Sequence, residues 1–403
     1  MKILFVTCAY PAGKEKILQD LNRGIPLAIQ ANTFQWGIME GLEKNQADYQ
    51  VVSYPSLSCF PLHYKKPITP AWDITIGEKR VGCMEPFLNI HLMAHCSIGK
   101  RIYRYAKRWV EENLAEEKLV ILVYSLSSWI LKSLLRVKKQ YPQIRICTIV
   151  TDLPKDVIVH MKAPSAIRVW AQMREAHKIE CAYPLIDKFV LLTAQMEKMI
   201  PQAVGKNLVL EGIWAEHEEP VVAKDGKLKT LLYSGSLGRH SCVDELLKAF
   251  ELTTDPDYRL VICGSGELEP MVKEAALKDE RIVFNGFVAR TEVLEMQKNA
   301  TAVINPRTPS VRLTQYSFPS KTIEYMTSGT PYIGHKLSGI PQEYYPYFYA
   351  IEDNTPESMA RTIESVFSKT QEELNAKAHA AYEFIQKNKR AQVQVGRLLD
   401  FLR

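Results

Sequence analysis

A lysine and a glutamate three residues apart, Lys321 and Glu324, lie in the segment F-P-S-K-T-I-E-Y-M-T-S-G-T-P, residues 318–331. The Pro-Ser-Lys turn before the amphipathic run and Gly329 after it predict a short helix. A helix start favours an anion such as phosphate, and Lys321 adds a full positive charge there. Glu324 projects from the same side and can accept hydrogen bonds from a sugar hydroxyl. The pair indicates a nucleotide-sugar site; the alternative is an ordinary helix start capped by Ser320.

Short apolar runs alternate with helical patterns along all 403 residues. Continuous apolar strands separated by helices favour parallel sheets that are covered on both faces. The predicted strands are 3–7, 51–54, 120–124, 145–150, 189–192, 229–233, 259–263, 282–284, 302–304 and 331–334.

Residues 211–228 are polar and contain Pro220 and Gly226, so they mark the best break between domains. We predict an α/β protein of two doubly wound, Rossmann-like domains, 1–210 and 229–384, with 211–228 as the linker. The last helical pattern spans about 370–403, and we expect its end, about 385–403, to pack back on the first domain.

Glycines and polar residues follow the predicted strands of the second domain. Open α/β sheets bind ligands beyond the carboxyl ends of their strands. Glycine lets the backbone approach a phosphate or a base, and Arg239 can grip phosphate oxygens with its planar fork. One such loop alone is usually turn geometry, but five on one side of a sheet favour a nucleotide site. The loops begin at Gly235, Gly264, Asn285, Asn305 and Pro319.

The second half resembles the GT-B-fold glycosyltransferases, and most closely glycosyltransferase family 4. The similarity covers roughly residues 229–339 and lies in an ordered set of motifs: G-S-L-G-R-H, L-V-I-C-G-S-G-E-L, R-I-V-F-N-G-F-V, A-V-I-N-P-R and F-P-S-K-T-I-E-Y. It implies two domains facing a cleft and a retaining transfer of a sugar from a nucleotide diphosphate to a glycan or lipid-linked acceptor, without a metal or other cofactor. Bacterial capsule, exopolysaccharide or lipopolysaccharide synthesis is the implied setting.

The resemblance also implies roles for individual residues. Lys321, Ser320, Gly235 and Arg239 match positions that hold the diphosphate, and Glu324 matches the position that holds the ribose. The segment of Phe287 and Val288 is similar to the base-reading edge. The remaining expected donor contacts are Ser236, Gly238, Gly264, Asn305, Arg307, Tyr316 and Thr322.

Three positions depart from the family pattern. Tyr316 stands eight residues before Glu324, where the family usually has a second glutamate, so the usual sugar contact and the donor sugar are open. Ser236 and Ser241 align with the common Arg and Lys of the phosphate loop, and we expect Arg239 to supply that charge instead. These departures keep alive a non-catalytic, decayed transferase as an alternative, beside a nucleotide-sugar epimerase on the same fold.

Breaking an anomeric C–O bond to a diphosphate builds negative charge on the leaving group and oxocarbenium character on the sugar. Lys321 and Arg239 are the cations expected to meet that charge, and a phosphate oxygen can take the acceptor proton. Asp152 follows a first-domain strand and is a candidate assistant; its alternative role is a turn or helix cap.

The segment 23–37 lies where the resembled family has its acceptor loop and first long helix. The resemblance therefore makes Asn32, Gln35 and Trp36 candidates for the acceptor side. The alternative for Trp36 is a core position, since Trp is strongly buried on average. The Asp255–Asp257 pair, D-P-D, resembles a metal-binding D-x-D, but it lies between a helix and a strand, away from the ligand side. We therefore interpret it as a turn and expect no metal site.

The first 200 residues hold 27 Lys and Arg against 18 Asp and Glu, a net charge of +9. In the run from Lys100 to Trp109, four cations recur at helical spacing beside Ile102, Tyr105 and Trp109, which suggests docking on an anionic membrane. The four are Lys100, Arg104, Lys107 and Arg108. A solvated basic face is the alternative, and no nucleic-acid reading motif is present.

Eight scattered cysteines indicate neither a disulfide framework nor a zinc site. The sequence shows no signal peptide, and its most apolar stretch, 119–135, falls short of a membrane span. We expect a cytoplasmic protein, peripheral to the inner face of the membrane if the basic run docks there.

Overall fold

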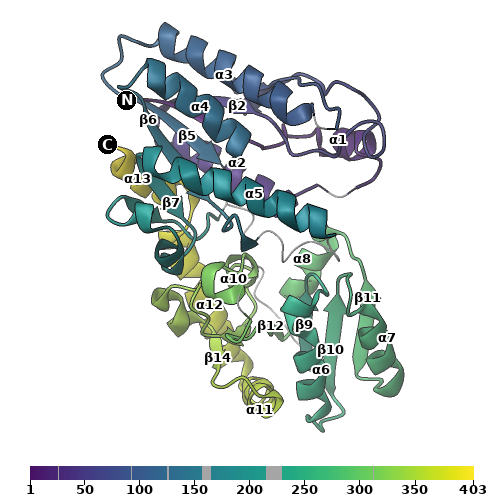
Figure 1. The fold of residues 1–403 in the computed structure, drawn as a ribbon. Helices are drawn as coiled ribbons and strands as arrows, with labels where there is room; N and C mark the ends of the chain where they lie inside the picture. Colours follow the sequence, from purple (N-terminus) through teal and green to yellow (C-terminus); the bar gives the residue numbers. More distant parts are fainter. Residues whose placement is uncertain (26, 92, 125–126, 157–164, 215–228, 312) are drawn as a thin grey trace. The chain divides into compact units, whose positions relative to one another are not determined.

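The computed structural model describes residues 1–25, 27–91, 93–124, 127–156, 165–214, 229–311 and 313–403 (Figure 1). The chain forms two compact units. Unit 1 is Met1–Ala215 together with Arg390–Arg403, and unit 2 is Glu216–Lys389.

Unit 1 is built on an eight-stranded sheet of order β3-β4-β2-β1-β5-β6-β7-β8. Every neighbouring pair is parallel except β3 and β4. The strands are β1 (Lys2–Thr7), β2 (Asp48–Ser53), β3 (Trp72–Ile76), β4 (Lys79–Met84), β5 (Leu119–Tyr124), β6 (Arg145–Val150), β7 (Lys188–Leu191) and β8 (Asn207–Val209). The helices are α1 (Glu15–Leu21), α2 (Ile29–Lys44), α3 (Ala94–Glu112), α4 (Ser128–Gln140), α5 (Ala166–Ala182) and α13 (Ala391–Leu402), with short 3-10 turns at Tyr183–Leu185, Ala194–Met199 and Pro201–Ala203.

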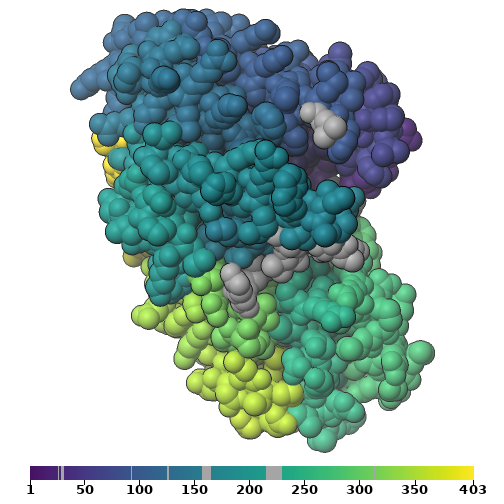
Figure 2. Space-filling model, viewed as in Figure 1, coloured from purple at the N-terminus to yellow at the C-terminus, as the bar shows by residue number. Residues whose placement is uncertain are grey.

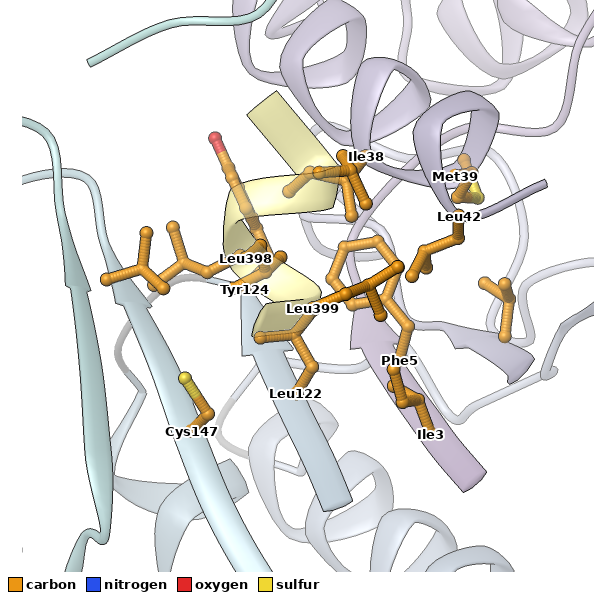
Figure 3. Close-up of a cluster of buried hydrophobic side chains, with 14 of the residues drawn as sticks. Ile3, Phe5, Ile38, Met39, Leu42, Leu122, Tyr124, Cys147, Leu398 and Leu399 are labelled. Carbon is orange, nitrogen blue, oxygen red and sulfur yellow. The ribbon is translucent and has the colours of Figure 1, made fainter. Parts of the chain in front are cut away.

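Helices cover both faces of this sheet, as its apolar strands require. On one face, side chains of α2 and α13 point into the same apolar cluster as those of β1 and β5 (Figure 3). The labelled members are Ile3, Phe5, Ile38, Met39, Leu42, Leu122, Tyr124, Cys147, Leu398 and Leu399. On the other face, α3 and α4 bury side chains such as Trp109 and Val137 against the sheet. Each large apolar side chain buried in this way contributes about 1.5–3 kcal/mol.

Unit 2 is built on a six-stranded parallel sheet of order β11-β10-β9-β12-β13-β14. Its strands are β9 (Lys229–Ser234), β10 (Tyr258–Cys263), β11 (Ile282–Gly286), β12 (Ala302–Asn305), β13 (Tyr332–His335) and β14 (Tyr349–Ile351). Its helices are α6 (Val243–Glu251), α7 (Glu269–Lys278), α8 (Arg290–Asn299), α9 (Leu313–Tyr316), α10 (Lys321–Met326), α11 (Pro356–Phe367) and α12 (Gln371–Asn388), with 3-10 turns at Arg239–Ser241 and Gln342–Tyr347. The order reverses between β9 and β12, as in a doubly wound fold.

The predicted α/β class and the two parallel sheets are confirmed, and each of the ten predicted strands corresponds to an observed one. Four strands were not predicted. β3 and β4 form an antiparallel hairpin at the sheet edge, where charged residues interrupt the apolar pattern. β8 and β14 are only three residues long.

The single helical pattern predicted over about 370–403 is wrong in one respect, because the structure has two helices there, α12 and α13. The break lies at Arg390, whose backbone is extended, with φ of −67° and ψ of 156°, and forms an isolated bridge with Trp214 of unit 1. Just before it, the buried ammonium of Lys389 pairs with Glu343 at 2.5 Å within unit 2. Two residues later the N–H of Ala391 donates to the carbonyl of Trp214 in unit 1. The return to unit 1 therefore begins at Arg390 rather than near residue 385.

Candidate functional site

The carboxyl edge of the unit 2 sheet is the place where a ligand is expected. Because β9 and β12 are neighbours while their following connections run in opposite directions along the sheet, the order reverses between them. Doubly wound sheets bind ligands in the crevice at such a point. The loops after β9 and β12 and the start of α10 all belong to this edge.

Two glycines pack the loop after β10 against the loop after β9. Gly264 and Gly266 have φ of 151° and 156°, in the region that favours glycine. A Cβ atom on Gly264 would lie 1.8 Å from the carbonyl oxygen of Gly235, and one on Gly266 would lie 2.6 Å from the carbonyl carbon of Leu237. The N–H of Gly235 donates to the carbonyl of Cys263 at 2.9 Å. Gly264 is therefore needed to shape this edge, whether or not it touches a ligand.

The helix that begins at Lys321 is short. α10 has six residues, and the side chain of Ser320 makes no capping hydrogen bond in it. The N–H of Thr322 donates to the carbonyl of Pro319 at 2.8 Å, and the side chain of Thr322 is fully buried. So short a helix adds little dipole, and the charge at its start comes from Lys321.

Glu324 lies in a preformed network of donors. Its Oε1 accepts from Lys321 Nζ at 2.5 Å and from Gln297 Nε2 at 2.7 Å, and its Oε2 lies 3.5 Å from Nη1 of Arg290. The side chain is only 16% exposed. Burial alone would raise the pKa of this carboxyl, but the charge and hydrogen bond of Lys321, with Gln297 and Arg290, outweigh it and hold the pKa below its usual value. Glu324 is an ionised acceptor at neutral pH.

Gln297, on α8, was not predicted, because nothing in its local sequence marks it. Its side chain is fully buried and also donates to Ser234 Oγ at 3.1 Å. Ser234 is also bonded to the hydroxyl of Tyr325. That hydroxyl accepts from the N–H of Ser234 at 3.2 Å and donates to the carbonyl oxygen of Ser234 at 3.1 Å. The end of β9, α8 and α10 are thus tied together around Glu324.

Arg239 and Arg307 are the other predicted cations at this edge. Arg239 is exposed, and its Nε lies 2.7 Å from Glu267 Oε1. Arg307 is half-buried, and among the described residues no carboxylate lies within ion-pair distance of it. Arg307 follows the end of β12 by two residues, and β12 is the neighbour of β9 in the sheet. Burial raises the pKa of Tyr233 to about 12, and the charge of Arg307 acts in the opposite direction. Arg307 is thus a cation for which no carboxylate of the described residues competes.

The other expected donor contacts differ in exposure. Phe287 is 83% exposed and follows Gly286, whose φ is 64°, so its ring is free to stack on a flat ligand. Ser236 is exposed, and Gly238 is half-buried. Val288 and Tyr316 are half-buried, whereas Asn305 is buried at the end of β12. The ligand-binding roles of these residues stay predictions.

In unit 1 the side chains predicted to contact the acceptor form hydrogen bonds with the protein's own backbone. Gln35 accepts from the N–H of Cys8 at 2.8 Å, and Asn32 accepts from the N–H of Tyr10 at 2.8 Å. The indole of Trp36 donates to the carbonyl of Tyr10 at 3.0 Å. These three side chains hold the loop that follows β1 at the carboxyl edge of the unit 1 sheet.

Asp152 is exposed two residues after the end of β6, at this same edge. It does not cap α5, whose N-cap is Ser165. In the D-P-D segment, Asp255 accepts from the N–H of Asp257 at 2.9 Å just before β10, so its interpretation as a turn is confirmed. In the described part of the chain no group of three His, Cys, Asp or Glu side chains could hold a metal ion.

The basic run on α3 has the exposed cations that the membrane hypothesis requires, but it lacks the exposed apolar side chains. Ile102, Tyr105 and Trp109 are buried in unit 1, so they offer no apolar face to a bilayer. Lys107 pairs with Glu111 at 3.5 Å, and Arg108 lies 3.8 Å from Glu112. Over the described residues, no helix has the length and apolarity that crossing a membrane requires.

Comparison with known proteins agrees with the predicted fold. Residues 215–384 match the family model described as glycosyl transferases group 1. No curated protein matches the chain.

Solved structures of glycosyltransferases match over essentially the whole length. Sucrose-phosphate synthase from Thermosynechococcus elongatus has a TM-score of 0.66 and 13% identity, over 100% of this chain and 99% of that one. The lipopolysaccharide outer core galactosyltransferase WaaB has a TM-score of 0.61 and 14% identity, over 100% of this chain and 99% of that one. S. aureus TarM, in a complex that includes UDP, has 0.62 and 10%, over 100% of both chains. The chain has the GT-B glycosyltransferase fold.

Proposed function

We propose that this chain is a retaining glycosyltransferase that moves a sugar from a nucleotide diphosphate to a hydroxyl of a glycan or lipid-linked acceptor. The observation that carries the proposal is the ionised Glu324, held by Lys321 and Gln297 beside the point where the strand order reverses. The match of residues 215–384 to glycosyl transferases group 1 supports it. So does the presence of UDP in the TarM complex.

The donor would be held by charge and hydrogen bonds that are already in place. Glu324 would hold the pentose, since a carboxylate can accept hydrogen bonds from two neighbouring hydroxyls. Lys321 has three donors and uses one on Glu324, so it can also meet a diphosphate oxygen. Arg307 can bind a phosphate oxygen without first breaking an ion pair among the described residues. Arg239 would have to break its ion pair with Glu267 or bind Glu267 and the phosphate together.

In the proposed reaction the anomeric C–O bond to the diphosphate breaks and a new bond forms from the anomeric carbon to the acceptor oxygen. The acceptor proton passes to a phosphate oxygen, and the nucleoside diphosphate leaves. The negative charge that develops on it is stabilised by fixed cations, which is where electrostatic catalysis is strongest. Lys321, Arg307 and Arg239 take this role, and the proposal assigns none of it to a metal or cofactor.

The identity of the donor sugar depends on Tyr316, which stands where related enzymes usually have a glutamate that contacts the sugar. A phenol cannot accept as a carboxylate does, so the sugar contact differs from the usual one. Surface polysaccharide synthesis in a bacterium is the setting we propose. The serines at positions 236 and 241 do not favour a decayed transferase, because Arg307, which pairs with no carboxylate in the described part of the chain, offers a cation at the same edge.

The test is donor binding and turnover by Glu324→Ala, with Glu274→Ala as the matched control. Glu274 is an exposed carboxylate on α7, paired with Lys278. A panel of sugar nucleotides, followed by thermal shift and calorimetry, identifies the donor first. We expect Glu324→Ala to remove turnover while the control keeps it. Undiminished transfer by Glu324→Ala would refute the assignment.

A further inference from the structure

One face of unit 1 concentrates positive charge. α3, α4 and α5 lie side by side over one face of the sheet, and their side chains form the blue-to-teal surface in the space-filling view (Figures 1 and 2). Right-handed crossovers place them there together, because β4, β5, β6 and β7 follow one another in one direction across the sheet. The three helices contain twelve Lys and Arg but four Glu, a net charge of +8.

The four glutamates of this face are already engaged within unit 1. Glu111 pairs with Lys107, Glu112 with Arg108, Glu175 with Ser128 and Lys178, and Glu180 with Lys155. Seven of the twelve cations have no carboxylate partner within the described ranges: Lys100, Arg104, Lys132, Arg136, Lys139, Arg168 and Arg174. α4 contains no acidic residue at all. The face therefore has an excess of positive charge that the carboxylates of the described residues do not neutralise.

α5 adds exposed apolar side chains to this charge. Ile167, Trp170 and Met173 are 77%, 61% and 41% exposed. They recur every three residues, so they lie along one side of the helix, while Ala176 and Ile179 are buried. The guanidinium of Arg174 lies 5.3 Å from the centroid of the Trp170 ring. A Trp among cations is typical of a protein surface at the bilayer interface.

We propose that the face formed by α3, α4 and α5, the basic face, docks on an anionic lipid bilayer, with Ile167 and Trp170 entering the interface. The unpaired cations would meet phosphate headgroups. Transfer of an indole and an isoleucine side chain from water into the bilayer interface lowers the free energy. The phosphate backbone of a nucleic acid offers no such apolar environment. This placement differs from the one expected from the sequence, because α3 supplies charge and α5 supplies the apolar anchor. If the proposed function holds, docking would bring the enzyme to a lipid-linked acceptor.

The experiment is sedimentation of the full chain with vesicles of phosphatidylcholine, with and without phosphatidylglycerol. One variant removes three unpaired charges of α4, Lys132→Gln/Arg136→Gln/Lys139→Gln, and a second is Trp170→Ser. Two controls lie on α7 of unit 2: Lys273→Gln/Lys278→Gln removes charge, and Leu277→Ser removes a side chain that is 89% exposed. Thermal unfolding and nucleotide diphosphate binding, measured on every variant, show that the fold and the donor site are intact.

We expect the wild type to bind the anionic vesicles, less at high salt, and to leave the neutral ones in solution. The α4 variant should bind about tenfold more weakly or worse, since each cation near the surface contributes separately. Trp170→Ser should also bind more weakly, and both controls should bind as the wild type does. Equal binding to neutral vesicles, equal binding by the α4 variant, or a dimer in solution that Trp170→Ser dissolves would overturn the proposal. Vesicle binding is read without turnover, so its failure leaves the proposed transfer reaction untouched.

Discussion

Replacing Lys321 by methionine should destabilise the protein in a way that depends on pH. The change keeps the apolar stem but removes the cation that lies 2.5 Å from Glu324. Both side chains are less than a quarter exposed, so the pair lies between a surface ion pair, worth about 0–1 kcal/mol, and a buried one, where losing a partner costs about 3–5 kcal/mol. We expect a loss of about 1–3 kcal/mol at neutral pH, because Gln297 and Arg290 still contact the carboxylate.

The pH dependence follows from the sign of the pKa shift. In the wild type the pKa of Glu324 is lowered on folding, so its contribution to stability is present above the unfolded pKa and is lost as pH falls through the folded one. In Lys321→Met the largest remaining influence is burial, which raises the pKa. The difference in unfolding free energy between wild type and variant should therefore shrink from neutral pH toward about pH 4, as the carboxyl takes up a proton.

Urea unfolding at a series of pH values measures this difference directly. Lys278→Met is the matched control, because Lys278 pairs with Glu274 on an exposed helix face, and it should leave stability unchanged. The same Lys321→Met protein should lose affinity for a nucleoside diphosphate but keep most of its affinity for the nucleoside. A destabilisation that stays constant with pH, or an equal loss of affinity for both ligands, would refute the reasoning.

Three further predictions concern the same unit. Gly264→Ala should cost about 2 kcal/mol or more in thermal or urea unfolding, because its Cβ would lie 1.8 Å from a backbone oxygen. The control is Gly396→Ala on α13 of unit 1, whose Cβ would make only an ordinary contact, 3.6 Å from Asn45 Oδ1, and which should be neutral or stabilising. Gln297→Leu should raise the pKa of Glu324 and weaken nucleotide binding most at acidic pH; calorimetry showing the same affinity ratio at all pH values would contradict it. Arg307→Met should lower the affinity for a nucleoside diphosphate about tenfold or more without altering the fold, and an unchanged dissociation constant would show that the cation lies idle.

The fold could be predicted because the strands of a parallel sheet can be recognised from the local sequence. Strands buried on both faces are continuous apolar runs, and each of those runs forms a strand in the structure. The hairpin of β3 and β4 was not predicted because the exposed charged residues Lys79 and Arg80, at the start of β4, interrupt the apolar run. The C-terminal pattern predicts a single helix because the extended backbone at Arg390 pairs with Trp214, which is distant in sequence, and no local signal marks it.

Much less of the site is visible in the sequence. The pairing of Lys321 with Glu324 follows from their spacing on a helix, and the pairing is observed. Gln297 and Arg290 could not be predicted, since they reach Glu324 from α8 and their spacing along the chain carries no signal. The reverse holds for Asn32 and Gln35, which were candidates for the acceptor side by the family resemblance of their segment. In the structure their side-chain oxygens accept from backbone N–H groups of the loop after β1.

The central claim, that unit 2 holds a nucleoside diphosphate at the start of α10, is tested most directly by a crystal structure of the chain with UDP or GDP. We predict that the diphosphate lies within hydrogen-bonding distance of Lys321 and that both ring hydroxyls of the pentose donate to Glu324. Density for the nucleotide at another place on the chain, or a site at α10 that stays empty at saturating ligand, would contradict it.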